Sequence, residues 1–319
     1  MTEKNSTKKS EPRVAVLMSV YNGGKYLDQQ LQSIFGQTIG SDRIAIYVRD
    51  DGSSDCTAEI LEKWKDRFPR NFFLERGKNV GAAQSFWKLL NKNIEAEYFA
   101  FSDQDDVWYP DKLERALAFL ESNKKDVPML YYSNARLVDT DLNDMGADAT
   151  PKGQSLSAFK ILAGISALGC TMVFNRETKK LAEDSSLQAI EMHDKSLLLL
   201  TYLAGCVLYD DRPGLAYRQH GDNVVGMNVR GTRRLWARWR RTYKRWFCSK
   251  AIRLSSQAEE LLDLLGEDIT EEQKSVLQDF VGYRKHVSMF WRLWKNEDLS
   301  DLPFRVRRSF RMRLLLGVI

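Results

Sequence analysis

The sequence predicts an α/β fold, in which a mostly parallel, Rossmann-like mixed sheet is flanked by helices. Strand-like and helix-like segments alternate four times before Pro128. The first strand-like segment, Val14–Val20, is a continuous run of mostly apolar residues, which is typical of a strand buried on both faces. Such alternation indicates a sheet with helices on both sides. A chain of 319 residues and 36.9 kDa can form one large or two ordinary domains.

Four strands and four helices are expected in this first part. Each helix follows its strand after a turn and places apolar residues on one face, such as Leu27, Leu31 and Ile34 in the first helix. The expected strands are Val14–Val20, Ile44–Val48, Phe72–Glu75 and Glu97–Phe101. The first helix should begin at Lys25 and the fourth at Asp111. The second helix should include Ile60, Leu61 and Trp64, and the third should include Phe86, Leu89 and Leu90.

After Pro128 the pattern is less regular. The expected elements are a strand at Met129–Ser133, a polar excursion or hairpin at Ala135–Asp148, a loop at Ala149–Ser157, a strand at Gly169–Asn175, a loop or helix at Leu181–Ile190, a buried helix at Ser196–Leu203 and a short strand at Val207–Tyr209. A helical pair is expected within Ser255–Phe290, with its second helix starting around Asp268–Thr270.

The composition is that of a soluble globular protein, with 43% hydrophobic and 29% charged residues. The four cysteines, Cys56, Cys170, Cys206 and Cys248, form no C-x-x-C pair, which argues against a disulfide framework or a zinc site and fits the cytoplasm. Residues 1–12 are polar and basic, so we expect a disordered tail and not a signal peptide. No apolar run reaches the roughly 18 residues of a membrane span.

Unusual residues follow the predicted strands at their carboxyl ends. Ligands bind at this edge in open α/β sheets, so we expect these residues to meet there. They are Tyr21 and Asn22, Asp50 and Asp51, Asn79 and Gly81, and Asp103 and Asp105.

The segment Ser102–Trp108 carries the strongest chemical signal. Its acidic residues Asp103, Asp105 and Asp106 repel one another, and a hard divalent cation with oxygen ligands would relieve that repulsion. The alternative is a solvated loop that caps the next helix. The aromatic residues and proline that follow favour the metal site, with Trp108 as a support beneath the loop.

Seven motifs in order resemble those of the inverting family 2 glycosyltransferases, especially the bacterial rhamnosyltransferase-like branch that builds cell-surface polysaccharides. The resemblance extends from about Arg13 to Gly226. The motifs are VYNGG (20–24), DDGSSD (50–55), NVG (79–81), SDQDDVW (102–108), GCTMVFN (169–175), HD (193–194) and YRQHGDNVVG (217–226).

The resemblance implies a nucleotide-diphosphosugar transferase (GT-A) fold and a set of residue roles. The donor would be dTDP-L-rhamnose first and a UDP-hexose second, and the cofactor Mn²⁺ or Mg²⁺. Tyr21 would lie against the pyrimidine, Asp51 would accept a hydrogen bond from the pyrimidine N–H, and Asp50 would support that loop. Asp103 would bind the ribose, and Asp105 would hold the metal. Asp194 would act as the general base, and His220 would be a further metal or phosphate ligand. Ser19, Asn22, Asn79, Gly81 and Gln104 would complete the donor site, with support from Asp106, Trp108, His193 and Arg218.

The chemistry of inverting transfer explains these residue types. The attacking hydroxyl needs a base within about 2.6–3.2 Å, and a divalent cation stabilises the leaving diphosphate. A histidine ligand would favour manganese over magnesium. His220 could instead be a structural loop residue, and His193 could pack or cap. The branch usually has two aromatic residues after His-Asp, whereas this chain has Lys195 and Ser196, which leaves the sugar and acceptor pockets unassigned.

The C-terminal part is basic. Residues 230–253 contain many arginines and lysines and no acid, and 233–247 predicts an amphipathic helix with an aromatic side. Such a helix suits an anionic membrane surface, and packing on the catalytic domain is the alternative. Arg305–Ile319 repeats the basic and apolar theme. We expect no nucleic-acid binding, because the cleft upstream is acidic.

These observations divide the chain and leave two competing functions. The predicted domains are the tail 1–12, a catalytic domain 13–228 with nucleotide-binding (13–128) and acceptor (129–228) halves, and a helical region 229–319.

A nucleotide-sugar-forming nucleotidyltransferase would need a Gly-rich, basic signature after the first strand, and a carbohydrate- or membrane-binding scaffold would not need the aspartates. The expected acceptor is a glycan or lipid-linked glycan, and the expected location is the cytoplasm or the inner face of the cell membrane.

Overall fold

The fold is built on one mixed sheet of nine strands. The computed structural model describes residues 13–151, 155–185, 192–220 and 254–319; the predicted tail 1–12 and helix 233–247 lie outside these residues. The strand order is β3-β2-β1-β4-β8-β6-β9-β5, with β7 paired to β6. The strands are β1 (Val14–Val20), β2 (Ile44–Asp50), β3 (Phe72–Arg76), β4 (Tyr98–Ser102), β5 (Val107–Trp108), β6 (Met129–Val138), β7 (Asp144–Asp148), β8 (Met172–Asn175) and β9 (Cys206–Arg218).

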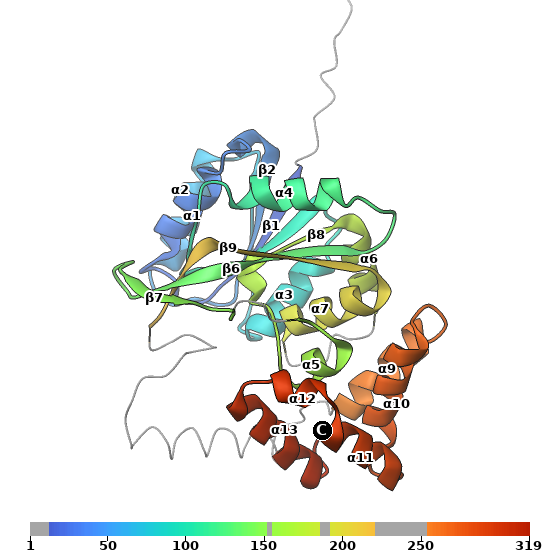
Figure 1. Ribbon diagram of the computed structural model, residues 1–319. Coiled ribbons are helices and arrows are strands. Elements are labelled where there is room, and N and C mark those ends of the chain that lie inside the picture. The colour runs from blue at the N-terminus through green and yellow to red at the C-terminus, as the bar shows by residue number, and fades with distance from the viewer. Residues whose placement is uncertain (1–12, 152–154, 186–191, 221–253) are drawn as a thin grey trace, which may run out of the picture.

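The first four strands form the parallel half that the sequence predicts. β1 pairs in parallel with β2 and β4, and β2 with β3. Alternate residues of β1 face opposite layers: Val14, Val16 and Met18 share a core with α1, α2 and α4, whereas Ala15 and Leu17 share one with α3 and α7 (Figure 1). These helices are α1 (Leu27–Phe35), α2 (Thr57–Arg67), α3 (Ala82–Leu90), α4 (Lys112–Ser122) and α7 (His193–Ala204).

The second half differs from the sequence prediction in the length of its elements. β6 continues beyond Ser133 to Val138 and forms the hairpin with β7, while Gly169–Thr171 is a 3₁₀ turn before β8. β8 is antiparallel to β4 and β6, so the sheet is mixed. Two further helices flank it, α5 (Ala158–Ala163) and α6 (Arg176–Asp184), and α7 begins three residues before the predicted Ser196.

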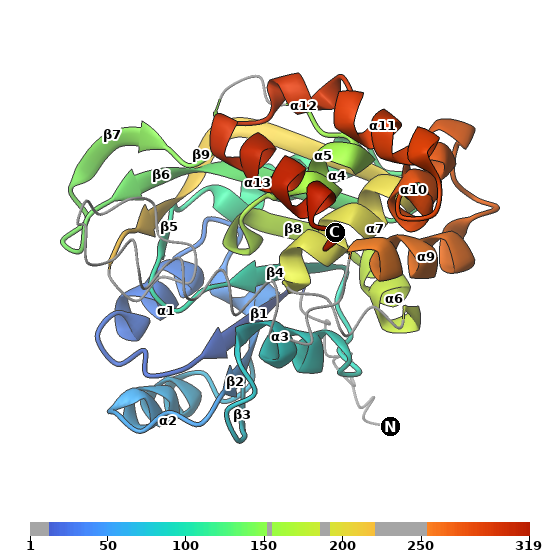
Figure 2. The same ribbon diagram turned by 90° about the horizontal axis from the view of Figure 1, so that it is seen from below.

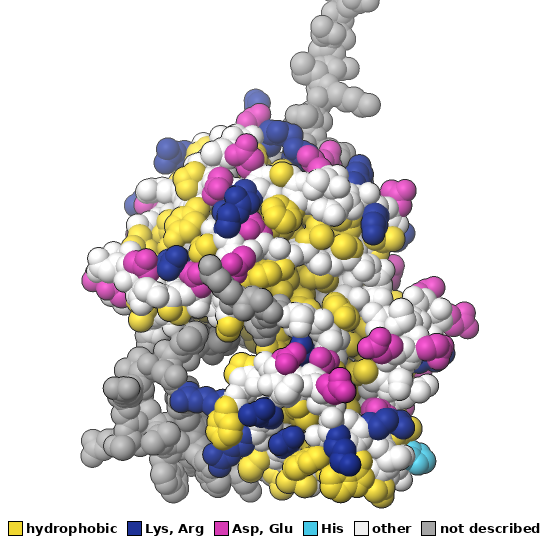
Figure 3. All heavy atoms as spheres, in the orientation of Figure 1, with side chains coloured by type: hydrophobic (Ala, Val, Ile, Leu, Met, Phe, Trp, Pro, Cys, Tyr) yellow, Lys and Arg dark blue, Asp and Glu magenta, His cyan; other side chains and the backbone are white. Residues whose placement is uncertain are grey.

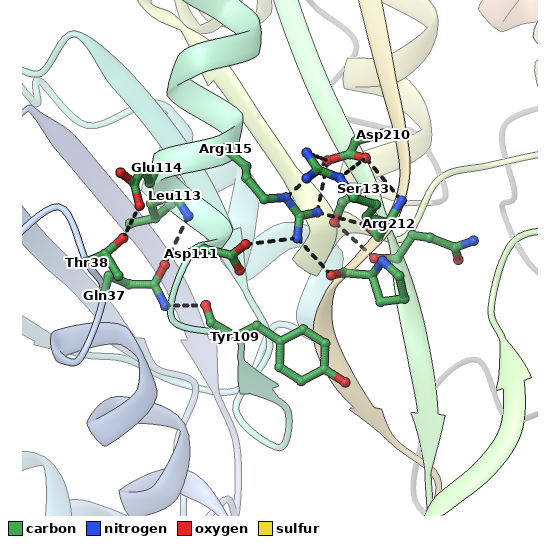
Figure 4. Close-up of polar contacts among 12 residues, drawn as sticks. Gln37, Thr38, Tyr109, Asp111, Leu113, Glu114, Arg115, Ser133, Asp210 and Arg212 are labelled. Carbon is green, nitrogen blue, oxygen red and sulfur yellow. Dashed lines mark hydrogen bonds and ion pairs between the residues drawn. The ribbon is translucent and has the colours of Figure 1, made fainter.

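β9 is the largest difference: the sequence predicts only Val207–Tyr209. Asp210 to Gly214 looks like a loop, but irregular pairing with β6 around Asn134 accommodates Pro213 within the strand. A buried ion pair also holds this part, because Arg115 of α4 donates to Asp210 at 2.9 Å and to the backbone oxygens of Arg212 and Pro213 (Figure 4). β9 therefore runs on to Arg218 and reaches the edge of the sheet where the acidic segment lies.

The C-terminal helices pack on the catalytic part instead of standing apart. They are α9 (Leu254–Leu265), α10 (Glu271–Gly282), α11 (Val287–Lys295), α12 (Asp298–Asp301) and α13 (Phe304–Leu315), so the predicted pair is part of a larger group. Figures 1 and 2 show them gathered against α5 and α7. Phe280 and Phe310 belong to the same core as Phe159 and Leu197. In the described parts of the chain, no helix combines the length and apolarity that a membrane crossing requires.

Candidate active site

A cleft of about 930 Å³ lies at the carboxyl ends of the parallel strands. It brings together residues from both halves of the sheet, including the acidic segment and Asp194 from the start of α7. The predicted residues that line it are Ser19, Tyr21, Asn22, Asp51, Asn79, Gly81, Asp103, Gln104, Asp105, His193, Asp194 and His220. Asp50, Asp106, Trp108 and Arg218 lie outside its lining.

Asp105 and His220 form a pair on the wall of the cleft. The imidazole Nε2 of His220 lies 2.8 Å from the Oδ2 atom of Asp105. The ring of Tyr26 stacks on His220, with 5.3 Å between the centroids, and so fixes the orientation of the imidazole. One oxygen and one nitrogen atom therefore lie side by side, and both kinds of atom can serve as ligands of a divalent transition metal.

Arg218 fixes the backbone at Asp105 through hydrogen bonds. Its side chain is buried at the end of β9, where Nε donates to the Asp105 carbonyl oxygen at 2.8 Å and Nη2 donates to Gln29 Oε1 at 2.7 Å. Its guanidinium also donates to the carbonyl oxygen of Thr140 and lies 4.4 Å from the Tyr26 ring centroid. Arg218 therefore supports the acidic segment from behind and does not reach into the cleft.

The acidic segment crowds carboxyl groups together beside the cleft. Burial, together with the charges of Asp105 and Asp194, raises the pKa of Asp103 to about 7. Burial likewise raises the pKa of Asp106 well above its usual range, and Asp106 Oδ2 has no hydrogen-bond partner within the described chain. Carboxylates held in this way fit a divalent cation, which would lower both pKa values.

A thiol and an ammonium lie beneath the segment. Carboxylate oxygens of Asp103 and Asp106 and the sulfur of Cys170 lie within 4.8 Å of one another. Burial raises the pKa of the Cys170 thiol and lowers the pKa of Lys112 to about 7. The Lys112 Nζ atom lies 3.4 Å from the ring centroid of Trp108, which is buried.

The predicted nucleotide-binding residues also hold one another in place. Both carboxylate oxygens of Asp51 accept from the Val80 amide, and Oδ2 accepts from the Gly81 amide at 2.8 Å. Arg49 pairs with Asp51 from the buried side. The Asp51 carboxylate thus shapes the Asn79–Gly81 turn. Only the remaining lone pairs of its oxygens can accept a hydrogen bond from a pyrimidine base.

Four further hydrogen bonds fix this end of the cleft. Asn22 Oδ1 accepts from the Ser54 amide at 2.8 Å, which joins the loops after β1 and β2. The Gln104 side chain accepts from the Tyr21 amide and donates to its carbonyl oxygen. The Ser53 amide donates to Asp50 Oδ1 at 2.9 Å, which ties Asp50 to the loop that follows β2.

Asp194 is held in the first turn of α7. Its Oδ1 accepts from the Lys195 amide at 2.7 Å, and its Oδ2 accepts from the Gly169 amide at 3.2 Å. A Cβ at position 169 would lie 3.1 Å from the Asp194 Cβ, so glycine allows this close approach. The carboxylate is oriented by backbone donors while it faces the cleft.

His193 is packed between aromatic rings. Phe86 stacks on it at 4.0 Å between centroids, and Phe101 meets it edge-on at 4.7 Å. Burial lowers the pKa of His193 to about 4, so the imidazole is neutral near pH 7. This geometry fits the packing alternative that the sequence left open.

Lys195 and Ser196, where the branch usually has two aromatic residues, point away from the cleft. Lys195 Nζ lies 3.3 Å from the carbonyl oxygen of Leu162 at the end of α5, and Ser196 Oγ donates to the Met192 carbonyl oxygen. These two residues are absent from the cleft lining, which therefore has no side chain from either position.

Sequence reasoning missed several lining residues. Lys25 and Tyr26 come directly after the loop that follows β1. Their closeness in sequence to Tyr21 could have indicated that they line the cleft. Thr140 lies in the turn between β6 and β7, within the predicted excursion or hairpin, and Tyr217 lies on the part of β9 that the sequence did not assign to a strand. Their contribution follows from the true length of those strands.

Sequence comparison defines the class of protein to which this fold and cleft belong. Residues 15–150 match the family model "Glycosyl transferase family 2". The chain is 33% identical over 230 residues to the dTDP-rhamnosyl transferase RfbG of Shigella flexneri, covering 66% of this chain and 74% of that protein. It is 25% identical over 248 residues to the putative teichuronic acid biosynthesis glycosyltransferase TuaG of Bacillus subtilis, covering 76% and 89%.

Solved structures share the fold. S. aureus TarS 1–349 in complex with UDP-GlcNAc superposes with a TM-score of 0.57 at 17% identity, over 96% of this chain and 82% of that one. The mannosyltransferase PcManGT of Pyrobaculum calidifontis, in complex with GDP-Man and Mn²⁺, superposes with a TM-score of 0.51 at 15% identity, over 97% of this chain and 81% of that one. The protein is therefore a glycosyltransferase with a GT-A-like fold. It belongs to glycosyltransferase family 2, and its resemblance to the rhamnosyltransferase-like branch is confirmed.

Proposed function

We propose that this enzyme transfers a sugar from a nucleotide diphosphate donor to an acceptor hydroxyl, with inversion at the anomeric carbon. The observation that carries this proposal is that Asp103, Asp105 and Asp194 line one cleft although they come from opposite halves of the sheet. A donor site and a base on facing walls suit a single displacement, in which the acceptor attacks as the diphosphate leaves.

Asp194 is the proposed general base. It lines the cleft, and two backbone amides fix its carboxylate, so a proton from the attacking hydroxyl has a defined acceptor. The proton ends on Asp194, the oxygen of the acceptor bonds to the anomeric carbon, and the bond to the diphosphate oxygen breaks. Neutral His193, packed on Phe86 and Phe101, closes the wall beside the base.

Asp105 and His220 are the proposed ligands of Mn²⁺ or Mg²⁺, and the mixed oxygen and nitrogen ligands favour manganese. When bound, such a cation supplies Lewis-acid stabilisation of the leaving diphosphate. Asp103 lies beside them and is the proposed partner of the donor ribose. Lys25 lines the same cleft and adds a positive charge near the diphosphate.

The donor is proposed to be dTDP-L-rhamnose, and a UDP-hexose is the second choice. The support is the 33% identity to a dTDP-rhamnosyl transferase over most of both chains. The teichuronic acid relative supports an acceptor in cell-surface polymer synthesis, which we propose to be a glycan or lipid-linked glycan. We place the reaction at the inner face of the cell membrane, with the basic C-terminal region toward anionic lipid.

A donor panel tests this proposal. The protein is incubated without acceptor with dTDP-rhamnose, UDP-hexoses and GDP-mannose, each with Mn²⁺, Mg²⁺ or EDTA, and both the thermal midpoint and the released nucleoside diphosphate are measured. We expect a cation-dependent rise in the midpoint and slow donor hydrolysis with one nucleotide sugar, because a ligand that binds only the native state stabilises it. If no donor binds and no donor is hydrolysed, the protein is a non-catalytic scaffold.

A further inference from the structure

The exposed side of α13 combines large apolar and basic side chains. Phe304, Arg308, Met312 and Leu315 recur at spacings of four, four and three residues and therefore share one side of the helix. Phe304 is 67% exposed and Leu315 65% exposed. Together with the exposed Leu316 we call these residues the α13 face. Exposed apolar groups of this size mark contact surfaces in proteins.

A basic cavity adjoins the α13 face. It has a volume of about 520 Å³ and lies between α11, α12 and α13. Lys295, Arg307 and Arg311 supply its positive charge, and Glu297 is the acidic residue among its lining. Arg311 and Leu315 are one helical turn apart, so the cavity and the α13 face are neighbours on one helix.

Arg311 is prepared for an anion. Its guanidinium lies 4.9 Å from the ring centroid of Trp294, which forms part of the cavity wall. Its Nε atom is buried and has no hydrogen-bond partner within the described residues. Arg311 lines the cavity, so a phosphate group there would meet its positive charge, and the stacked ring holds the guanidinium in place.

Besides Glu297 in the lining, three acids of the C-terminal helices are already engaged with other residues. Asp301 accepts from Lys160 Nζ at 2.8 Å, and Asp298 accepts from Ser157 Oγ, so both are directed toward α5. Asp279 accepts from Arg292. α13 itself carries arginines and no acid. In Figure 3 the lower end of the molecule, where α11 and α13 lie, shows Lys, Arg and hydrophobic side chains side by side.

We propose that the cavity and the α13 face form a docking surface for an anionic phospholipid bilayer. The cavity binds a lipid phosphate, and Phe304, Met312 and Leu315 enter the boundary between headgroups and acyl chains. A basic, apolar helix surface binds in this way because buried apolar area and attraction to anionic lipid add together. This inference deepens the membrane contact in the proposed function, and it does not depend on which donor is used.

Vesicle sedimentation of the full chain tests the proposal. Vesicles of phosphatidylcholine alone are compared with vesicles that also contain phosphatidylglycerol. The variants are an apolar pair, Phe304→Ser with Leu315→Ser, and a cavity pair, Arg307→Ala with Arg311→Ala. We expect the wild-type chain to prefer the anionic vesicles. The cavity pair should lower the partition coefficient by about 25-fold, because each of two basic residues near the surface contributes about fivefold. The apolar pair should lower it by on the order of tenfold or more, because the apolar area buried in the bilayer is lost.

Matched controls keep the outcome decisive. Met145→Ser removes an apolar side chain of β7 that is 55% exposed, and Lys63→Ala with Arg70→Ala removes two exposed charges from the catalytic part. Binding should be unchanged in both controls. Residues 230–253 are present in every variant, so a loss in the α13 variants arises from this surface. Full vesicle binding by both pairs would overturn the proposal.

Two further measurements separate this proposal from other outcomes. Donor hydrolysis without acceptor should be unchanged in both pairs, so that loss of membrane binding is distinguished from failure of the donor reaction. If the wild-type chain instead self-associates without lipid, and the apolar pair abolishes this without affecting vesicle binding, the α13 face belongs to a second copy of the chain and the proposal is wrong.

Discussion

At the scale of single residues, the two carboxylates with separate proposed tasks can be tested separately. Asp194→Asn keeps the shape of the side chain and the acceptor oxygen for one backbone amide, but removes the basic group. We expect turnover to fall by about 10²–10⁴-fold, the usual contribution of a general base, while donor affinity measured by calorimetry stays within about twofold. Asp66→Asn, an exposed acid of α2, is the matched control. Unchanged turnover in Asp194→Asn would refute the base assignment.

Asp103 gives a prediction about stability and pH. Its pKa is raised to about 7 in the cation-free protein, so the native state holds this proton more tightly than the unfolded state. Its effect is absent below about pH 4 and destabilises the fold increasingly as the pH rises toward about 7. In EDTA, Asp103→Asn should therefore raise stability at about pH 8 by on the order of 1–2 kcal/mol and change little at about pH 4.

Thermal midpoints at both pH values, with EDTA and with Mn²⁺, check this expectation. Saturating Mn²⁺ should stabilise the wild-type protein and reduce or reverse the advantage of Asp103→Asn, because the cation compensates the buried charge. An equal gain at both pH values would show that the substitution acts through packing and not through charge.

The sequence predicts which residues approach the cleft better than it predicts what each one contacts. Tyr21, Asp51, Asp103 and Asp105 follow strands, and parallel strands end at one edge, so their meeting follows from topology. The bond of the Asp51 carboxylate to the Gly81 amide, and that of Gln104 to Tyr21, depend on loop conformations that no residue pattern specifies. His193 could not be assigned from sequence because its packing partners, Phe86 and Phe101, lie far away in the chain.

At the scale of elements, the end of β9 determines where Asp105 lies. Arg218 donates to the Asp105 carbonyl oxygen, to Gln29 and to Thr140, three groups on separate segments. Arg218→Met should leave these acceptors without their donor, lowering stability by about 2–3 kcal/mol and weakening Mn²⁺ binding. Denaturant unfolding and metal titration measure the two effects.

Arg212→Met is the matched control for that prediction. Arg212 lies on the same strand and pairs with the Asp210 carboxylate, but its side chain is largely exposed, so a small change is expected. If both variants bind Mn²⁺ as the wild type does, Arg218 does not position the acidic segment.

β9 also shows why element boundaries were predicted unevenly. β1 was predicted to the residue because a run buried on both faces is apolar throughout. β9 contains Asp210, Arg212 and Pro213, whose polar and cyclic side chains are typical of loops. Their place in a strand depends on Arg115, which lies 95 positions away from Asp210 in the sequence. A contact of that range has no local signal.

At the scale of the whole molecule, the C-terminal helices and the catalytic part share a hydrophobic core. Phe310 of α13 packs against Phe159 of α5 with 5.3 Å between ring centroids, and both are buried. Phe310→Ala should cost about 3–5 kcal/mol and lower the midpoint of one cooperative transition that abolishes donor binding as well. Calorimetry and donor binding during heating provide the measurement.

Phe304→Ala is the internal control, because Phe304 lies on the same helix but on its exposed side. It should leave the midpoint within about 1 °C, as surface substitutions usually do. Two transitions in the wild-type protein, of which Phe310→Ala shifts only one, would show that the C-terminal helices unfold independently. The predicted boundary at 228/229 would then separate two independently stable domains.

The pairing of β4 with β8 has a consequence for how the enzyme becomes active. The strand that leads to Asp103 and Asp105 and the segment that leads to Asp194 are joined side by side by this antiparallel contact. A folding intermediate that contains only the first four strands could present the nucleotide-binding loops while lacking the base. If Asp194 is the base proposed above, sugar transfer requires both the β4–β8 pairing and a chain that extends into α7.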